Sequence, residues 1–191
     1  MGVDWETLEG ACQSCQKCRL WETRTQVVIG RGSKTGKILF VGEGPGQQED
    51  ATGLPFVGPA GQLLDKMLAA AGLREEQYYI ANVVKCRPPG NRDPHDDEQA
   101  ACMNYLRYQF LLLRPKIVVC LGRIAAQALI DPGFKITRQR GQWMERKGCS
   151  MMATYHPSAL LRDASKKRPA WEDIQAVRDK LYELFPAERP R

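Results

Sequence analysis

Residues 37–46 read "KILFVGEGPG" and join a short apolar run to a glycine-rich turn. The run has the length and composition of a buried β-strand. Similar runs predict strands at Lys37–Gly42, Tyr78–Lys85, Lys116–Leu121 and Ser150–Tyr155. Helical apolar patterns occupy Ala60–Gly72, Asp96–Leu113, Gly122–Ile130 and Pro169–Leu184. Strands that alternate with helices predict an α/β fold with a mostly parallel sheet covered on both faces.

Three of the predicted strands end in unusual local sequences. "GEGPG" follows the first strand, "KCRPPGNRDP" follows the second, and "HPSALLR" follows the fourth. Ligands of such sheets bind beyond the carboxyl ends of the strands. We therefore expect these three segments to meet at one site. The pair Asp93-Pro94 is also predicted to cap the helix that starts at Asp96.

The size and composition suit a single globular domain spanning residues 1–191. No apolar stretch approaches the roughly 20 residues that cross a bilayer, and the first residues lack the layout of a signal peptide. We expect a cytoplasmic monomer with no membrane contact. The net charge is +6, from 28 basic and 22 acidic residues, which favours an anionic partner such as nucleic acid. Charge alone is equally compatible with a basic, solvated surface, but the basic residues gather in the last third of the chain, in "TRQR", "MERKG" and "SKKRP".

The glycine-rich turn does not fit a nucleotide site. The dinucleotide pattern G-x-G-x-x-G accommodates Gly42 and Gly44, but Gln47 occupies its third glycine position. The segment "GRGSKTGKI" fails the P-loop pattern, because Ile38 stands where Ser or Thr must bind the metal. We therefore expect no nucleotide cofactor. The next loop carries Phe56, which is either a core side chain or a stacking platform for a flat ligand.

Seven cysteines are many for an intracellular chain, where stable disulfides are rare. The run C-x-x-C-x-x-C near the N-terminus has a spacing that suits metal binding. Cys120 and Cys149, in or beside predicted strands, are interpreted as small core residues. Four thiolates would make either a zinc site or an iron–sulfur cluster, and the spacing does not separate the two. The candidate ligands are Cys15, Cys18, Cys86 and Cys102, with Cys12 as a competitor of Cys15.

Taken together, these segments resemble the family 4 uracil-DNA glycosylases, the iron–sulfur members of the uracil-DNA glycosylase superfamily. The resemblance rests on "CQKCRLWETRT", "VGEGPGQQED", "TGLPFVGPAGQLLD", "ANVVKCRPPGNRDP", "YHPSALLR" and "WEDIQ", which occur in the family's order and spacing over nearly the whole chain. It implies a three-layer αβα sandwich around a parallel four-stranded sheet. It also implies a structural 4Fe–4S cluster held by Cys15, Cys18, Cys86 and Cys102.

The resemblance further implies an enzyme that flips uracil out of DNA and hydrolyses its N-glycosidic bond, leaving an abasic site. A base must leave the stack before an enzyme can reach it. Phe56 would stack on the uracil, Asn82 would bond N3–H and O4, and His156 would donate to O2 as negative charge builds there. Cytosine presents the reverse donor pattern to Asn82. The uracil-binding residues implied are Gly42, Glu43, Gly44, Glu49, Phe56, Asn82 and His156.

Two acidic residues of the site have less settled roles. Glu49 is placed by family comparison to crowd C5 of uracil and so exclude thymine. The better-known branch of the superfamily has a water-positioning aspartate where this chain has Gly44. Glu43 is the candidate replacement, either by orienting water or by fixing the loop through a bond to Asn91.

DNA is expected to be held by loops, whether it is single- or double-stranded. Leu160 or Leu161 would fill the gap left by the flipped base, although both also suit the start of a helix core. Arg162 is placed on phosphate, with Arg140, Lys166, Lys167 and Arg168 as further contacts. His95 is expected to be a solvated surface residue. Three alternatives remain: a glycosylase for another deaminated base such as hypoxanthine, a uracil-binding module without turnover, and a zinc-stabilised nucleic-acid adaptor.

Overall fold

The structure is a computed structural model that describes residues 3–146 and 148–190. Its centre is one mixed sheet with the strand order β1-β3-β2-β4-β6-β5. The four inner strands are parallel: β2 (Ile38–Gly42), β3 (Tyr78–Asn82), β4 (Ile117–Leu121) and β6 (Cys149–Thr154). The predicted α/β fold is confirmed. The sheet is larger than predicted, because β1 (Arg31–Gly32) and β5 (Met144–Arg146) add short antiparallel edges.

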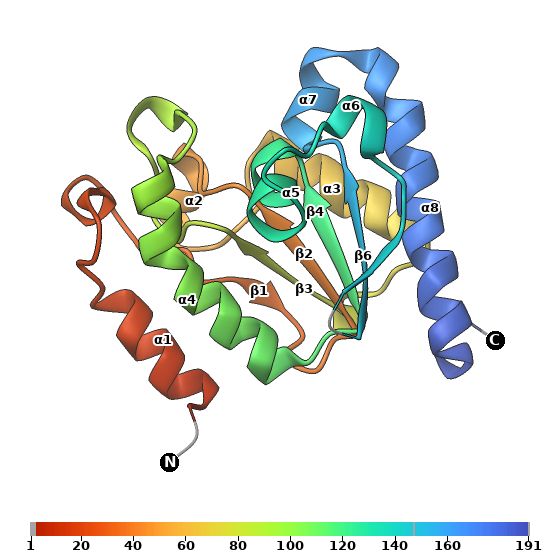
Figure 1. Ribbon diagram of the computed structural model, residues 1–191, viewed down its shortest axis with the longest axis horizontal. Helices are drawn as coiled ribbons and strands as arrows, with labels where there is room; N and C mark the ends of the chain where they lie inside the picture. Colours follow the sequence, from red (N-terminus) through yellow and green to blue (C-terminus); the bar gives the residue numbers. More distant parts are fainter. Residues whose placement is uncertain (1–2, 147, 191) are drawn as a thin grey trace.

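Helices cover both faces of the sheet and make three layers (Figure 1). One face carries α1 (Trp5–Gln13), α4 (Asp96–Leu113) and α5 (Arg123–Leu129), and the other carries α3 (Pro59–Ala70) and α8 (Lys167–Leu184). The short helices are α2 (Gln47–Thr52), α6 (Ile136–Gln139) and α7 (Pro157–Arg162). In the part of the chain that the structure describes, no helix is both long and apolar enough to cross a membrane.

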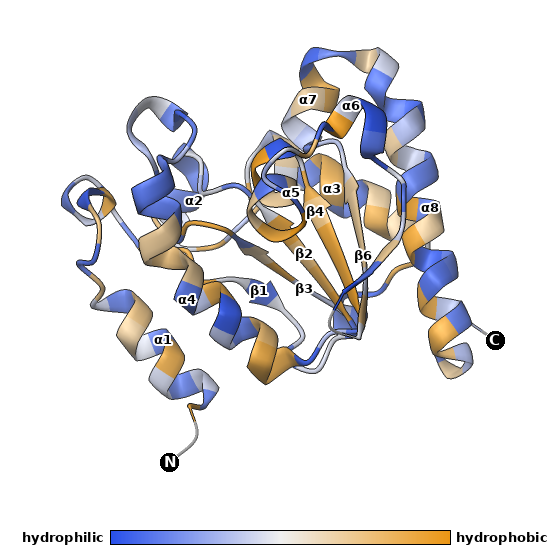
Figure 2. Ribbon diagram, in the orientation of Figure 1, coloured by the Kyte–Doolittle hydropathy of each residue, from blue (hydrophilic) through white to orange (hydrophobic). Residues whose placement is uncertain are grey.

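Two hydrophobic cores lie on opposite faces of the sheet. Along β2, Leu39 and Val41 pack with the α1, α4 and α5 layer, while Ile38 and Phe40 pack beneath α3 and α8. All five residues of this strand are buried, as expected for a parallel strand covered on both sides. The strands are accordingly the most apolar part of the molecule, and the outer helix faces are polar (Figure 2).

The end of β3 differs from the prediction in a way that shapes the site. The strand stops at Asn82 and not at Lys85. Beyond it, the N–H groups of Val83 and Val84 still donate to the carbonyls of Gly42 and Glu43, at 2.9 and 3.1 Å. The chain then turns to carry Lys85 and Cys86 beneath the sheet edge, where they are buried.

The start of α4 also differs from the prediction. The N-cap is His95, whose N–H donates to the Glu98 carboxylate at 2.8 Å. Arg92 binds the same carboxylate at 2.7 Å, and these hydrogen bonds, with that of Arg92 first, lower the pKa of Glu98 to about 2. Asp93 is therefore not the cap. Its carboxylate instead pairs with Arg123 at 2.5 Å, while the His95 side chain is half exposed, as predicted.

Candidate active site and cysteine cavity

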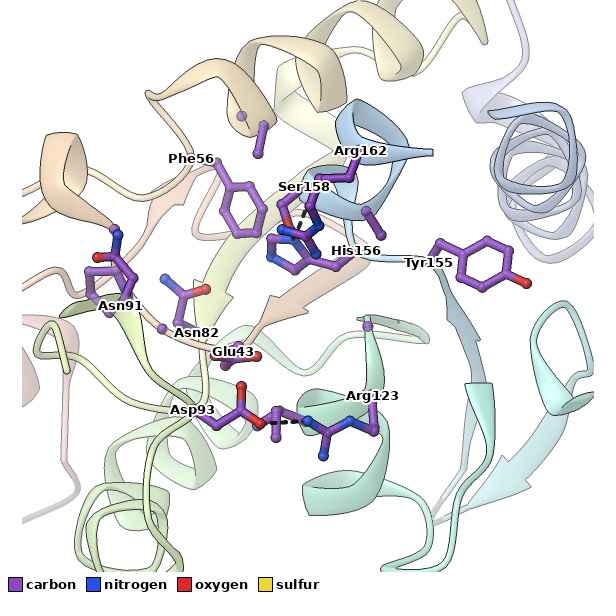
Figure 3. Close-up of a pocket in the computed structure, with 18 of the residues that line it drawn as sticks. Glu43, Phe56, Asn82, Asn91, Asp93, Arg123, Tyr155, His156, Ser158 and Arg162 are labelled. Carbon is purple, nitrogen blue, oxygen red and sulfur yellow. Dashed lines mark hydrogen bonds and ion pairs between the residues drawn. The ribbon is translucent and has the colours of Figure 1, made fainter. Parts of the chain in front are cut away.

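A cavity of about 510 Å³ opens beyond the carboxyl ends of the parallel strands. Residues from the segments after β2, β3 and β6 line it together, so the predicted meeting of these three strand ends is confirmed. The segment after β4 also contributes, through Gly122 and Arg123, which the sequence did not suggest. Figure 3 shows Phe56, Asn82 and His156 around the same space.

Gly42, the last residue of β2, permits the close packing of the cavity floor. A Cβ at this position would lie 2.5 Å from Asn82 Oδ1 and 2.6 Å from Phe56 Cζ. Both distances are far below van der Waals contact, so any side chain here would displace one of the two residues. Glu43 and Gly44 follow directly and line the cavity as well.

Asn82 carries the most informative polar atom of the cavity. The residue is 1% exposed, and its Oδ1 is the one buried side-chain oxygen or nitrogen without a hydrogen-bond partner in residues 3–146 and 148–190. Leaving such an acceptor unpaired costs about 1–3 kcal/mol. A ligand that brings an N–H donor to this atom would recover that free energy.

Phe56 is held in a strained backbone conformation above the cavity. Its φ of 55° lies in the left-handed region, which costs a non-glycine residue of order 1–3 kcal/mol. Glu49 stabilises the loop, because its carboxylate accepts the N–H groups of Val57 and Gly58, both at 2.8 Å. The Phe56 ring is buried and lies 5.7 Å from the His156 ring, centroid to centroid. Glu49 therefore supports this loop while it also lines the cavity.

His156 is the N-cap of α7, and its surroundings fix its tautomer. Nδ1 accepts the Ser158 N–H at 3.1 Å and lies 2.8 Å from Ser158 Oγ. Because Nδ1 is an acceptor, the ring proton resides on Nε2. Burial, reinforced by the charge of Arg162, lowers the pKa of His156 to about 4. The residue is thus a neutral N–H donor at physiological pH.

The pKa of Glu43 is shifted in the opposite direction from that of His156. Burial and then the negative charge of Asp93 raise its pKa to about 7, while Arg123 acts against them. Within the described ranges, Glu43 makes no hydrogen bond to Asn91. The Asn91 Oδ1 instead accepts from Arg87 Nε at 2.8 Å. The interpretation that Glu43 fixes the loop through Asn91 is therefore wrong.

The expected DNA-contacting residues divide into buried and accessible ones. Leu160 is 1% exposed and belongs to the core, so it is not a wedge; Leu161 is 52% exposed. Arg140 pairs with the buried carboxylate of Asp173 at 2.6 Å, which argues against its predicted phosphate contact. Arg162 and Lys166 line the cavity, with Lys166 also 3.2 Å from Asp163, and Lys167 and Arg168 are exposed.

Three residues with clear structural roles in the cavity were missed by the sequence analysis. Ser158 sets the histidine tautomer, and its place in "HPS" is a signal that could have drawn attention to it. Asp93 and Arg123 form an ion pair beside Glu43 (Figure 3). That pair joins two loops distant in sequence, and no local pattern indicates it.

A second cavity lies under the segment after β3 and is lined by cysteines. They are Cys12, Cys15, Cys18, Cys86 and Cys102. Arg24 clamps two of the chain segments here, because Nη1 donates to the Cys15 carbonyl at 2.7 Å and to Cys86 Sγ at 3.3 Å. The Lys85 N–H donates to Cys102 Sγ at 3.2 Å. Cys120 and Cys149 are buried in the core, as predicted.

The donor set of this cavity is chemically suited to a metal centre, because cysteine thiolates bind both zinc and iron–sulfur clusters. Among the residues the structure describes, no group of three His, Cys, Asp or Glu side chains is arranged around a single metal ion. N–H donors aimed at sulfur, as seen at Cys86 and Cys102, suit anionic thiolate ligands.

Comparisons with known proteins found a matching family and several relatives that cover most of the chain. The sequence profile of the Uracil DNA glycosylase superfamily matches residues 29–175. A type-4 uracil-DNA glycosylase of Archaeoglobus fulgidus is 49% identical over 185 residues, which are 93% of this chain and 91% of that protein. The type-4 enzyme of Thermotoga maritima is 44% identical, with 91% of this chain and 92% of that protein covered. That of Sulfurisphaera tokodaii is 43% identical over 87% of this chain and 80% of its own length.

Proposed function

The chain belongs to the type-4 branch of the uracil-DNA glycosylase superfamily, and from this premise we propose how its residues release uracil from DNA. The chain is a DNA repair enzyme that cleaves the bond between uracil and deoxyribose. Each residue of the strand-end cavity has a separate role in binding the base or cleaving this bond. The proposal rests above all on one observation, the buried Asn82 Oδ1 that lacks a donor.

Asn82 reads the edge of the flipped base. Its Oδ1 accepts the N3–H of uracil, and its amide nitrogen donates to O4. Cytosine has an acceptor at N3 and an amino group at C4, so both bonds would fail and buried polar groups would remain unpaired. Phe56 stacks on the face of the same ring. Glu49, which braces the Phe56 loop, would crowd C5 and exclude the methyl group of thymine.

His156 stabilises the leaving group. As the N-glycosidic bond breaks, its electron pair moves onto the base and negative charge builds on uracil O2. The neutral Nε2–H of His156 donates to that oxygen, and Ser158 keeps Nδ1 as the acceptor. A fixed donor aimed at a developing anion is worth about 2.7–4 kcal/mol in comparable sites.

Glu43 activates the water. The structure leaves its carboxylate without a bond to Asn91, and burial keeps its pKa at about 7, the range in which a carboxylate acts as a general base. The water oxygen forms the new bond to C1′ of the sugar, Glu43 takes the proton, and the uracil anion leaves. The products are an abasic site and free uracil.

The DNA is held around the cavity by exposed residues. Leu161 enters the gap that the flipped base leaves in a duplex. Arg162, Lys166 and Lys167 contact backbone phosphates. None of these contacts reads base sequence, so uracil should be accepted whatever the neighbouring bases are.

The cysteine cavity holds a 4Fe–4S cluster on Cys15, Cys18, Cys86 and Cys102. Cys12 is 1% exposed within the core and is the less accessible competitor of Cys15. When bound, the cluster ties the N-terminal segment to the chain after β3 and supplies no step of the reaction. Purified protein should absorb visible light and contain iron and sulfide. Cys86→Ser should abolish this absorption and Cys149→Ser should retain it, whereas a colourless zinc protein would contradict the assignment.

One experiment tests the recognition mechanism. Oligonucleotides that contain uracil, thymine, cytosine or hypoxanthine at one position are incubated with the enzyme, and abasic sites are counted. We expect cleavage at uracil and a loss of at least tenfold in Asn82→Ala. Stronger cleavage at hypoxanthine would favour the alternative substrate, and binding of uracil-DNA without abasic sites would indicate a module without turnover.

A further inference from the structure

Lys85 lines the cysteine cavity and is linked to the strand-end cavity through Asn82, one of the residues that line it. Its side chain is fully buried, and its Nζ donates to the main-chain carbonyl of Asn82 at 2.7 Å. The same ammonium donates to Gln109 Oε1 at 2.6 Å, and Gln109 is anchored in turn by its bond to the Ile29 carbonyl at 2.9 Å. The Lys85 N–H donates to Cys102 Sγ at 3.2 Å.

Burying the ammonium group of Lys85 carries a large desolvation free energy. Both of its oxygen acceptors are neutral, and none of the ion pairs found in residues 3–146 and 148–190 involves Lys85. Charges are rarely buried without a counter-charge, because desolvation costs several kcal/mol. Cysteine thiolates that held a cluster in the adjoining cavity would supply that counter-charge. An apolar side chain would nevertheless fill the same space at less cost, so stability alone does not explain Lys85.

The hydrogen bond from Lys85 Nζ to the Asn82 main-chain carbonyl indicates a role in positioning Asn82. Asn82 is the last residue of β3, where the regular strand pairing ends. The Asn82 side chain has little room, because Gly42 packs directly against it. A Cβ added to Gly42 would lie only 2.5 Å from Asn82 Oδ1. A small movement of the Asn82 main chain would therefore carry Oδ1 away from the position that meets uracil N3–H.

We propose that Lys85 is a positioning residue for uracil recognition, which fixes the Asn82 main chain so that its carboxamide faces the base. Lys85 does not touch the substrate and acts only through Asn82. The inference rests on the uracil-reading role of Asn82 proposed above. It predicts that losing the ammonium weakens uracil binding specifically and leaves the contacts to DNA backbone intact.

The test compares Lys85→Met with the unaltered holoenzyme. Calorimetric titration gives the affinity for free uracil, and a separate titration gives the affinity for DNA that contains an abasic site. We expect the uracil affinity to fall about tenfold, as if one of the hydrogen bonds between Asn82 and the base were lost, while the affinity for abasic DNA and the iron content stay unchanged. A general structural role would instead weaken both kinds of binding together.

Gln77→Met is a matched control. Gln77 is equally buried and lies just before β3 begins, at the strand end far from the cavity, where its amide binds Glu188 at 2.9 Å. This variant should lose stability and keep its uracil affinity.

Gln109→Glu keeps the proposal testable if Lys85→Met does not fold. The introduced carboxylate should draw Nζ away from the Asn82 carbonyl and lower uracil affinity severalfold, again without changing abasic-DNA binding. Unchanged uracil affinity in the variant that folds, or equal losses for both ligands, would overturn the role of Lys85. If Asn82→Ala itself kept full uracil affinity, the proposed function of Asn82 would fail instead.

Discussion

Burial shifts the pKa values of two cavity side chains in opposite directions, and both shifts favour the same reaction. It raises the pKa of Glu43 to about 7 and lowers that of His156 to about 4. Above pH 7 the cavity therefore combines a carboxylate that can accept a proton with a neutral imidazole that can donate a hydrogen bond. These are the two states that an attacking water and a departing uracil anion require.

The rate of uracil release should accordingly rise with pH through about 7. Below that pH Glu43 is protonated and cannot accept the proton of water, whereas His156 does not change its charge until the pH approaches 4. Single-turnover rates measured from about pH 5 to about pH 9 should follow the titration of one group. Glu43→Gln should be slower and lack this rise.

Asp93→Asn provides a specific control for that titration. The Asp93 charge contributes to the raised pKa of Glu43, and its removal also frees Arg123 to act on Glu43. The midpoint of the pH profile should therefore move to lower pH. An unshifted midpoint, or the same midpoint in Glu43→Gln, would assign the titration to another group.

His156→Ala should reduce the rate of uracil release by about 10²–10³, as for other donors that stabilise an oxyanion. Ser158→Ala should cost much less, because the Ser158 main-chain N–H still holds Nδ1 as an acceptor. Rapid-quench assays with saturating enzyme measure both rates. Full activity in His156→Ala would refute its assigned role.

The sequence revealed the cavity residues unevenly. Asn82 ends a strand, His156 follows one, and Phe56 lies in the glycine- and proline-bound loop between α2 and α3, so pattern and resemblance together pointed to them. The partner of Asn91 could not be inferred, because it depends on the path of the loop between Arg87 and Asn91. Lys85 was missed for a statistical reason, since lysine is almost always exposed.

At the scale of elements, length decided which strands could be predicted. β2 and β4 have five buried apolar residues each, and their predicted starts were one residue early. β1 and β5 have two and three residues, which is too short for any periodicity to appear. β3 was predicted too long because Val83 and Val84 continue the apolar run after the strand has ended, where they enter the core beside the cysteine cavity.

Helix α7 offers a matched pair of adjacent leucines. Leu160→Ala removes a buried side chain and should lower the free energy of unfolding by about 2–5 kcal/mol. Leu161→Ala should change stability by less than about 0.5 kcal/mol, because its side chain is half exposed. Denaturant unfolding measures both.

The rate of uracil release tests whether Leu161 acts as a wedge in duplex DNA. Leu161→Ala should slow uracil release from double-stranded DNA more than from single-stranded DNA, since only the duplex has a gap to fill. Equal slowing on the two substrates would argue against a wedge at this position.

At the scale of the whole molecule, the basic residues behind the net charge of +6 have two roles. Some neutralise buried acidic side chains, and others are exposed to solvent. Arg140 neutralises Asp173, which is 3% exposed and also accepts a hydrogen bond from Thr154 just before His156. Arg162, on the outer side of α7, is exposed at the cavity. Composition alone cannot distinguish these two arginines, although both lie in the basic last third of the chain.

Their substitution should separate binding from stability. Each phosphate contact releases counterions, so Arg162→Gln should reduce the slope of log affinity against log salt concentration by about 1. Arg140→Gln should leave that slope unchanged and lower the free energy of unfolding by about 3–5 kcal/mol, because it strands the buried Asp173 carboxylate. Fluorescence titrations of labelled uracil-DNA at several salt concentrations, below the unfolding temperature of each variant, measure the slopes. If Arg140→Gln flattened the slope as much as Arg162→Gln, then Arg140 would leave Asp173 to bind phosphate, and the division between internal and DNA-binding charge would be wrong.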